Sequence, residues 1–433
     1  MKRHTAPTLT CITAMTLFVA LALPVQSAAQ EQQQEHKKEQ PHRYRVTDLG
    51  TLGGTFSLAG GLNNRGDVEG FSTLSGDTTI HAFLWRKGHM TDLGTLGGPN
   101  STASWRLNER SKVGGAAETS TPDPLGEDFC GFGTHLICLP TVWRKGVPAP
   151  LPTLGGSNGF AAGVNNRGQV VGYAENSTPD PTCEAPQVLQ FKPVAWEKGQ
   201  VQELPTLFGD SAGFAAMIND RGQAVGVSGS CTRSIHAVLW QNGTVTDLGS
   251  LGGTENFASD MNNQGQVTGL SNLPGDAAFH AFLWENGVMT DLGTLPEDVS
   301  SSGDGINRKG QVVGGSFDAD GNGRASLWQN GVIADLNTLI PADSPLFLIE
   351  ATGTINSRGQ IAGFALQKST GEIHAFLATP REEEEEEDGA QSATPAVLSV
   401  TSQSSKVVLP ENVRKMLKQR LTSAPRAARL MKQ

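Results

Sequence analysis

Basic residues and long apolar runs are scarce in this 433-residue sequence, and each shortage argues against a class of protein. Beyond residue 29 no segment offers the roughly 20 consecutive apolar residues that a membrane-spanning helix needs. Residues 44–380 hold 19 Lys and Arg against 32 Asp and Glu, a net charge of −13. Binding to a phosphate backbone needs a basic footprint, so this balance argues against a nucleic-acid partner.

Sequence motifs of familiar catalytic sites give no assignment either. The chain contains no H-E-x-x-H pattern and no phosphate-binding P-loop. Sites on repeat proteins assemble from distant loops, so an enzyme is not excluded. No catalytic residue is assigned.

The N-terminus has the pattern of a secretory signal peptide. Lys2 and Arg3 precede an apolar stretch that is densest over residues 14–23, and small residues lead to a cleavage site after Ala29. The apolar stretch is shorter than a membrane span. We therefore predict a signal peptide over 1–29, a flexible polar lead-in over 30–43 and a secreted, extracytoplasmic protein without a transmembrane anchor.

Four cysteines remain after that cleavage: Cys130, Cys138, Cys183 and Cys231. An even number in an exported protein indicates disulfide bonds, whose connectivity the sequence does not fix. Our first expectation pairs Cys130 with Cys138, since both lie in one inserted segment, and Cys183 with Cys231 between neighbouring repeats. Metal binding is the alternative, and the absence of a C-x-x-C pair argues against it.

Three short patterns recur in fixed order seven times each. They are an Asn-centred turn such as INRKGQVVG, a strand such as HAFLW, and a segment such as MTDLGTLGG. The turn asparagines are spaced by 45, 57, 54, 43, 45 and 49 residues, a period typical of propellers and solenoids. Those asparagines are Asn63, Asn108, Asn165, Asn219, Asn262, Asn307 and Asn356.

Local chemistry predicts two β-hairpins in each repeat. Glycine follows the Asn-centred turn, and pairs such as Asn242-Gly243 follow the HAFLW strand, as hairpin turns require. Four strands per repeat make one propeller blade. The array begins with a fourth strand at residues 44–52 and ends with an HAFL strand at 374–377. We predict an all-β, seven-bladed β-propeller over 44–380, closed by pairing of these two strands, and an open β-solenoid as the alternative.

Recurrent residues have a structural and a functional interpretation. Histidines at 81, 236, 280 and 374 could form a metal ring, but Leu139, Lys192 and Arg324 stand at the equivalent positions, which favours structural hydrogen bonds. Recurrent tryptophans favour packing between blades over an exposed platform for glycans. The aspartates of the DLG segments are expected to accept backbone hydrogen bonds at turns.

Two features lie outside the repeat. Asp318, Asp320 and Asn322 match the start of a calcium loop, although Gln329 occupies the twelfth position, where an EF-hand has Glu. We predict a possible calcium site there. Insertions at about 116–139 and 174–192 both contain Ser-Thr-Pro-Asp-Pro. Since binding residues tend to lie on loops of a rigid scaffold, the face that carries these insertions is our candidate functional surface.

Residues 381–433 form a tail that is first acidic and then basic. Six consecutive glutamates begin at Glu382, and the pattern favours a disordered segment. Val413, Met416, Leu417 and Leu421 have helical spacing, so the alternative is a short amphipathic helix that contacts an anionic surface.

The recurring HAFLW, INxxGQVVG and DLGTLGG patterns resemble bacterial extracellular repeat proteins known as the HAF family. The resemblance covers about residues 44–378. It implies export and carries no functional residue to this chain. The leading hypothesis is a secreted binding or scaffold module for an extracellular glycan or protein. The alternatives are an extracellular carbohydrate-active enzyme, either a glycosidase or a lyase, and a calcium-stabilised structural protein of the cell envelope.

Overall fold

The computed structural model describes residues 43–103, 106–233, 235–381 and 407–422. The predicted signal peptide, nearly all of the lead-in and the acidic run that begins at Glu382 lie outside these ranges. In the described chain, 28 β-strands are accompanied by one 3₁₀ turn, η1 (Leu336–Thr338), and one α-helix, α1 (Glu411–Thr422). The all-β prediction is confirmed.

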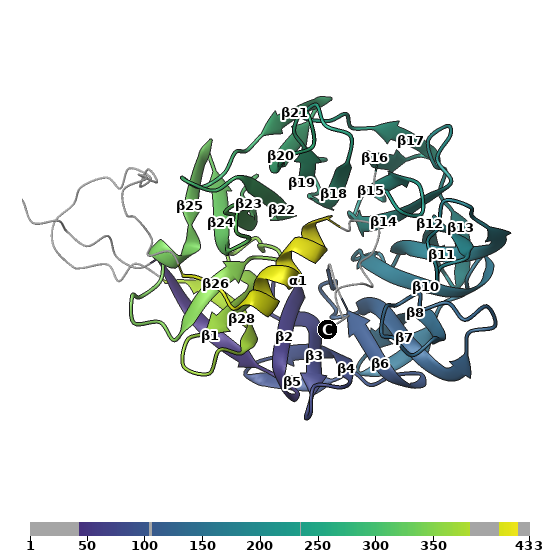
Figure 1. Ribbon diagram of the computed structural model, residues 1–433, viewed down its shortest axis with the longest axis horizontal. Coiled ribbons are helices and arrows are strands. Elements are labelled where there is room, and N and C mark those ends of the chain that lie inside the picture. Colours follow the sequence, from purple (N-terminus) through teal and green to yellow (C-terminus); the bar gives the residue numbers. More distant parts are fainter. Residues whose placement is uncertain (1–42, 104–105, 234, 382–406, 423–433) are drawn as a thin grey trace, which may run out of the picture. The chain divides into compact units, whose positions relative to one another are not determined.

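The strands form seven groups of four around a common axis, and we call each group a blade (Figure 1). Five blades are separate antiparallel sheets. The other two merge into one eight-stranded sheet through a single parallel bridge between Phe56 and Ile373. This arrangement fits seven propeller blades.

The first strands of blades 1 to 7 lie nearest the axis: β2 (Gly53–Leu62), β6 (Gly97–Ala103), β10 (Gly155–Val164), β14 (Ala212–Ile218), β18 (Asn256–Met261), β22 (Ser300–Ile306) and β26 (Leu346–Glu350). The second strands are β3 (Val68–Leu74), β7 (Val113–Pro122), β11 (Val170–Pro179), β15 (Ala224–Gly229), β19 (Val267–Asn272), β23 (Val312–Phe317) and β27 (Ile361–Gln367). The third strands are β4 (Ile80–Arg86), β8 (Leu136–Arg144), β12 (Leu189–Glu197), β16 (His236–Gln241), β20 (Phe279–Glu285), β24 (Gly323–Gln329) and β28 (Ile373–Pro380). The outer strands are β5 (His89–Asp92), β9 (Val147–Pro150), β13 (Gln200–Glu203), β17 (Thr244–Asp247), β21 (Val288–Asp291), β25 (Val332–Asp335) and, for blade 7, β1 (Tyr44–Gly50).

The turn chemistry of the sequence explains the hairpins. Asn242 and Gly243 both have positive φ angles, 52° and 77°, as a two-residue hairpin turn of type I′ requires. Gly168, with a φ of 88°, ends an Asn-centred turn in the same region of backbone space. Ser111 stands at the equivalent place in blade 2 with a φ of 54°. A non-glycine residue rarely adopts this left-handed conformation, so the backbone of that turn is strained.

The two ends of the repeat array meet in blade 7. Strand β1 pairs antiparallel with β28, in a register that runs from Tyr44 opposite Pro380 to Gly50 opposite Ala375. These are the strands that the sequence predicts to pair.

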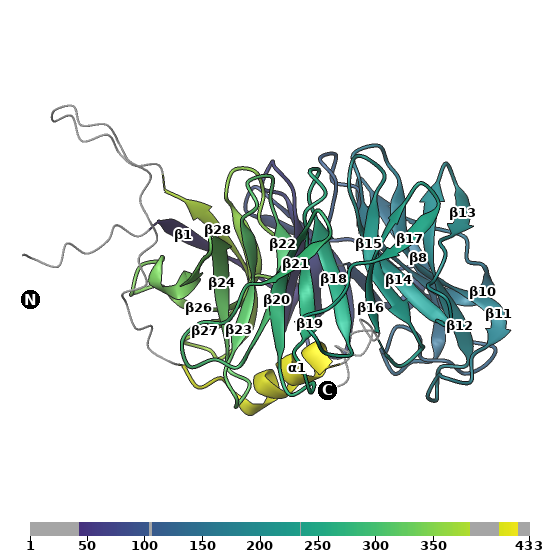
Figure 2. The same cartoon turned by 90° about the horizontal axis from the view of Figure 1, so that it is seen from above.

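The strands end at two opposite faces, which Figure 2 shows edge-on. Because neighbouring strands are antiparallel, the turns between first and second strands and the hairpins between third and fourth strands share one face, the Asn-turn face. The loops between second and third strands lie at the other end of the blades, on the insertion face.

Tryptophans fill the spaces between blades. Trp143 and Trp196 are only 1% and 2% exposed, and the Trp240 indole donates a hydrogen bond to the Pro205 carbonyl at 2.7 Å. Of the six recurrent tryptophans only Trp284 is not fully buried. The expected packing role is confirmed, and these residues form no glycan platform because five of the six rings are buried.

The loops between the second and third strands of blades 2 and 3 are shorter than the insertions predicted at 116–139 and 174–192. Strands β7 and β11 continue to Pro122 and Pro179, so the connecting loops span only 123–135 and 180–188. Disulfides join Cys130 to Cys138 and Cys183 to Cys231, as expected. The first lies within one insertion, and the second joins blade 3 to blade 4.

The prediction that all of 381–433 is a disordered tail needs correction, since residues 411–422 form α1. The helix lies on the insertion face (Figures 1 and 2). Its Val413, Met416 and Leu417 are buried in a cluster with propeller residues such as Phe317 and Phe347. The helical spacing of these three residues is the signal that the alternative prediction used. No helix in the described ranges has the length and apolar content to cross a membrane.

Candidate functional site

The seven turn asparagines connect each blade to the next. Asn165 is representative: its Oδ1 accepts hydrogen bonds from the backbone N–H groups of Arg167 and Gln169, which closes the turn. Its Nδ2 donates to the Asn219 carbonyl in the next blade at 3.0 Å. The same bond between blades occurs at 3.0 to 3.3 Å from Asn63 to Asn108, Asn108 to Asn165, Asn165 to Asn219, Asn219 to Asn262, Asn262 to Asn307, Asn307 to Asn356 and Asn356 to Asn63.

A second set of polar residues immediately follows the asparagines and surrounds the axis. Its members are Asn64, Glu109, Asn166, Asp220, Asn263, Arg308 and Ser357. Most of them bond to one another across blade boundaries. The Asn166 backbone N–H and Nδ2 donate to the two carboxylate oxygens of Asp220 at 2.8 and 2.9 Å, and Asn263 Nδ2 donates to Asp220 at 3.2 Å. Arg308 is the exception, since its guanidinium has no hydrogen-bond acceptor and its side chain is exposed.

The two sets line a cavity of about 290 Å³ on the axis, at the Asn-turn face. Buried apolar residues such as Leu107 and Ile306 also line it, and Arg106 contributes a guanidinium. Burial acts to raise the pKa of Asp220, but hydrogen bonds from Asn166 and Asn263 and the charge of Arg106 lower it below its ordinary value. The cavity therefore offers amide donors and acceptors, an ionised carboxylate and the guanidinium of Arg308, which forms no ion pair with any residue that the structure describes, over an apolar base.

The sequence patterns did not indicate this site, because the asparagines were interpreted as turn residues only. Their signal was present: the Asn position is the same in all seven repeats, whereas the histidine position is not. The candidate surface that the sequence selected, the insertion face, lies at the opposite end of the blades.

On the insertion face the longest loops are held by buried polar contacts. Glu127 of the blade 2 loop accepts hydrogen bonds from the backbone N–H groups of Val188 and Leu189, both at 2.7 Å. Gln187 Nε2 donates to both Glu127 and Glu175, at 3.1 and 2.8 Å. Burial and the neighbouring Glu127 charge raise the pKa of Glu175 to about 8. These carboxylates are fully covered, so they join two loops rather than face a ligand.

The candidate calcium residues form a tight turn. Asp318 Oδ1 accepts hydrogen bonds from the backbone N–H groups of Asp320 and Asn322, and Asn322 Nδ2 donates to Asp318 Oδ2. Asn322 Oδ1 accepts from the Leu409 N–H just before α1, at 2.9 Å. The Lys418 side chain of α1 lies over Gly321. The oxygens thus hold the turn and the helix, and calcium binding stays a prediction.

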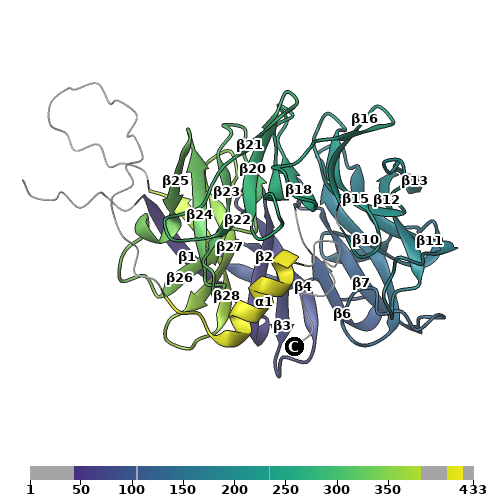
Figure 3. The same cartoon turned by 45° about the horizontal axis from the view of Figure 1, so that its top comes forward.

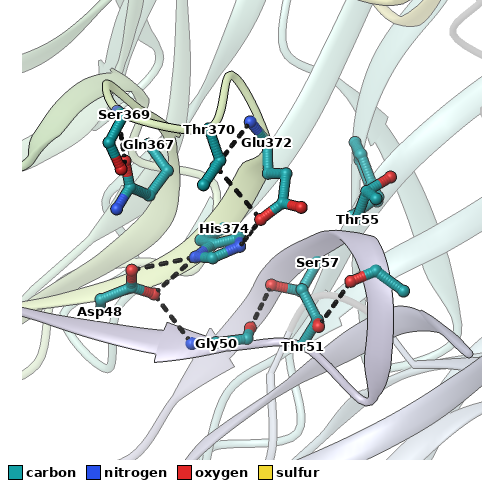
Figure 4. A network of polar contacts seen from close by, with 12 residues as sticks. Asp48, Gly50, Thr51, Thr55, Ser57, Gln367, Ser369, Thr370, Glu372 and His374 are labelled. Atoms are coloured by element: carbon teal, nitrogen blue, oxygen red, sulfur yellow. Dashed lines mark hydrogen bonds and ion pairs between the residues drawn. The ribbon is translucent and has the colours of Figure 1, made fainter. Parts of the chain in front are cut away.

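The recurrent histidines are hydrogen-bonded to the DLG aspartates rather than grouped around a metal. His374 Nδ1 lies 2.9 Å from Asp48, whose Oδ1 also accepts from the Gly50 N–H at 2.8 Å (Figure 4). The same arrangement joins His81 to Asp92, His236 to Asp247 and His280 to Asp291. The predicted structural roles of these residues are confirmed.

One match to a catalytic motif lies in β10. Residues 155–159 read G-G-S-N-G, which fits the G-x-S-x-G pattern of hydrolase nucleophiles. Such a serine needs a sharp turn between a strand and a helix. Here the segment is extended within a strand, so it is not a nucleophile elbow.

The chain matches no protein-family model and no curated protein. Among solved structures it is similar to a puromycin-hydrolysing peptidase from Mycobacterium tuberculosis, with 14% identity and a TM-score of 0.44 over 77% of this chain and 53% of that one. It is also similar to the β-propeller domain of the trilobed protease from Pyrococcus furiosus, with 12% identity and a TM-score of 0.41 over 64% and 81%. A third is an oligogalacturonate lyase in complex with manganese, with 11% identity and a TM-score of 0.49 over 79% and 97%. The chain spans about half the length of the peptidase, and no functional residue is carried over.

Proposed function

We propose that this chain is an exported seven-bladed β-propeller that binds a glycan in the axial cavity of its Asn-turn face. Closure of the ring is part of the proposal. It is supported by the pairing of β1 with β28 and by the bond from Asn356 back to Asn63. Export is supported by the signal-like N-terminus and by two disulfides, which persist in oxidising compartments. Membership of the HAF-repeat group belongs to the same proposal.

The axial cavity carries the argument for glycan binding. Its volume of about 290 Å³ is at the small end of ligand pockets, which suits one or two sugar rings. The side chains of Asn64, Asn166 and Asp220 bond across blade boundaries, but an amide has two N–H donors and a carboxylate accepts about four bonds, so each can also bond to a sugar hydroxyl group. Leu107 and Ile306 at its base suit the apolar face of a sugar ring.

The same geometry favours binding over hydrolysis. A glycosidase needs one carboxylic acid that stays protonated and a second carboxylate. The cavity contains two carboxylates, Glu109 and Asp220, but the pKa of Asp220 is lowered and Glu109 accepts hydrogen bonds from Asn64. A carbohydrate-active enzyme remains the alternative, because these two groups are the ones it would use.

A retention assay tests the proposal. The exported protein is mixed with insoluble polysaccharides and cell-envelope fractions, and the supernatant is assayed for released sugars. We expect retention without release, and at least about tenfold weaker retention for Arg308→Ala, since a charged hydrogen bond is worth about 1.5–3 kcal/mol. Arg45→Ala, an exposed arginine on β1, is the control. Released sugar would establish the enzyme instead, and equal retention of both variants would remove the cavity as the site.

The calcium-stabilised structural protein is tested separately. Calcium that binds only the folded chain raises its melting temperature. A shift that Asp318→Asn abolishes, with no retention on any glycan, would replace the binding proposal with that structural role.

A further inference from the structure

The third residue of each Asn-centred turn is almost always a cation. The seven positions are Arg65, Arg110, Arg167, Arg221, Gln264, Lys309 and Arg358. All of these side chains are exposed. Each of them directly follows a residue that lines the axial cavity, so they surround that cavity without lining it, whereas Arg308 does line it.

The outer hairpins of the same face add further cations. Counting the five residues from each turn asparagine and the four after each recurrent tryptophan, this face holds 13 of the 19 Lys and Arg of residues 44–380. It holds only five of the 32 Asp and Glu. The turns therefore carry a net charge of +8, and the rest of the propeller carries −21. The overall charge of −13 therefore conceals a positively charged set of turns on the Asn-turn face.

Most of the ring cations are not neutralised within the chain. Arg65 and Arg86 pair with Asp67, at 3.3 and 2.8 Å. Arg167, Arg221 and Arg358 form no ion pair with any residue that the structure describes. In a chain so rich in carboxylates, unpaired arginines at symmetric positions form a surface suited to an external anion.

We infer that the glycan is acidic, a polymer of uronic acids, with one sugar in the axial cavity and its neighbouring carboxylates on the arginine ring. This inference rests on the proposed function and names the class of its ligand. The planar arginine fork matches a carboxylate with two parallel hydrogen bonds. Nucleic acid fits less well, since the turns of this face contain no Phe, Tyr or Trp on which a base could stack.

Polygalacturonate and its methyl ester separate charge from sugar recognition, because they differ only in the carboxylate. Without divalent cations, we expect the full exported chain to bind polygalacturonate at least about tenfold more tightly than the ester. The affinity should fall as salt rises, as for other polyanion contacts. Equal binding of both polymers would overturn the acidic ligand and leave the glycan proposal standing. Binding of neither would overturn the acidic ligand, and the retention assay on the other polysaccharides would then decide the glycan proposal separately.

A matched pair of variants locates the contact. R167Q/R221Q/R358Q gives three blades the glutamine that blade 5 already has at Gln264, so the turns should keep their conformation. R45Q/K192Q/K415Q removes the same charge elsewhere. We expect at least about tenfold weaker binding for the first set and less than about twofold for the second. Equal losses would show a bulk charge effect and overturn the ring.

Duplex DNA at the same ionic strength is the last comparison. Binding as tight as that of polygalacturonate would overturn the acidic glycan in favour of a general polyanion surface. If the triple variant fails to melt cooperatively, the comparison of polygalacturonate with its ester still decides the inference in the unaltered protein.

Discussion

The guanidinium Nη2 of Arg106 lies 2.7 Å from the carboxylate Oδ2 of Asp260, although 154 residues separate them in sequence. Arg106 follows β6, the first strand of blade 2, and Asp260 lies in β18, the first strand of blade 5. Figure 3 shows that these two strands belong to blades that are not neighbours, so the ion pair joins distant blades across the axis. Asp260 also accepts hydrogen bonds from the Ile306 N–H and from Thr354 of blades 6 and 7. This ion pair and the two hydrogen bonds together connect four blades at the base of the axial cavity.

Replacement of Arg106 by methionine should strongly destabilise the protein. Asp260 is only 2% exposed, and removal of one partner of a buried ion pair costs about 3–5 kcal/mol, because the other charge stays buried. Adding Asp260→Asn to Arg106→Met should recover part of that loss. Urea unfolding of the three variants measures both effects. A loss below about 1 kcal/mol for Arg106→Met would show that water compensates the carboxylate.

Asn165→Ala tests the bonds between blades. The variant removes the acceptor for two partly buried backbone N–H groups and the donor of a buried hydrogen bond to Asn219. We expect the free energy of unfolding to fall by about 3 kcal/mol, since unsatisfied buried groups cost about 1–3 kcal/mol each. Gln200→Ala, an exposed residue of an outer hairpin, is the control and should change it by less than about 0.5 kcal/mol.

The joined ends predict a dependence of stability on pH. The hydrogen bond and charge of Asp48, with a contribution from Glu372, raise the pKa of His374 above 6.5 although burial opposes the rise. A raised histidine pKa stabilises the fold fully below the unfolded value, and this contribution is lost as pH rises through the folded pKa. Burial acts to raise the pKa of Asp48, but bonds from His374 and Gly50 lower it, so its contribution is lost only as pH falls through that low value.

Melting temperatures across this range give the test. They should be highest between the ordinary pKa of Asp and that of His, and should fall as pH rises through the raised pKa of His374. His374→Gln should flatten the decline on the alkaline side. A variant with an unchanged profile would show that other groups set the dependence.

The two disulfides should differ in their contributions. The chain-entropy model gives about 4 kcal/mol for the 48-residue loop between Cys183 and Cys231, and about 2.5 kcal/mol for the 8-residue loop between Cys130 and Cys138. Paired replacement by serine, followed by denaturant unfolding, measures each. The reverse order would indicate that the longer bridge strains the native fold.

Leu417→Ala should release α1 without unfolding the blades. Leu417 is fully buried on the insertion face, and such a truncation costs about 2–5 kcal/mol. We expect this loss to exceed the free energy that holds α1 on the propeller. Limited proteolysis should then cut near residue 411 while the propeller stays resistant. Lys415→Ala, on the exposed side of the helix, should leave the pattern unchanged.

Structural features that depend on residues close together in the sequence were predicted well. Asn242-Gly243 predicted its hairpin because the backbone of two residues decides the turn. The expectation for Cys130 and Cys138 held because both lie in one short insertion. The insertions themselves were placed too early, at Ala116 and Ala174, because extended strand residues there look like loop residues when no partner strand is visible. The net charge of the propeller gave no indication of the positively charged turns, because it is a sum over all residues.

The sequence by itself determined the seven repeats, the four strands in each and the strands that meet at the two ends, because turn residues and apolar alternation act over a few positions. Only the tertiary structure decided that Asn165 bonds to Asn219, that Arg106 reaches Asp260, that α1 covers part of the insertion face and that the cations collect on one face. Each of these depends on the rotation from one blade to the next, which brings together residues 40 or more positions apart, and no local pattern encodes that rotation.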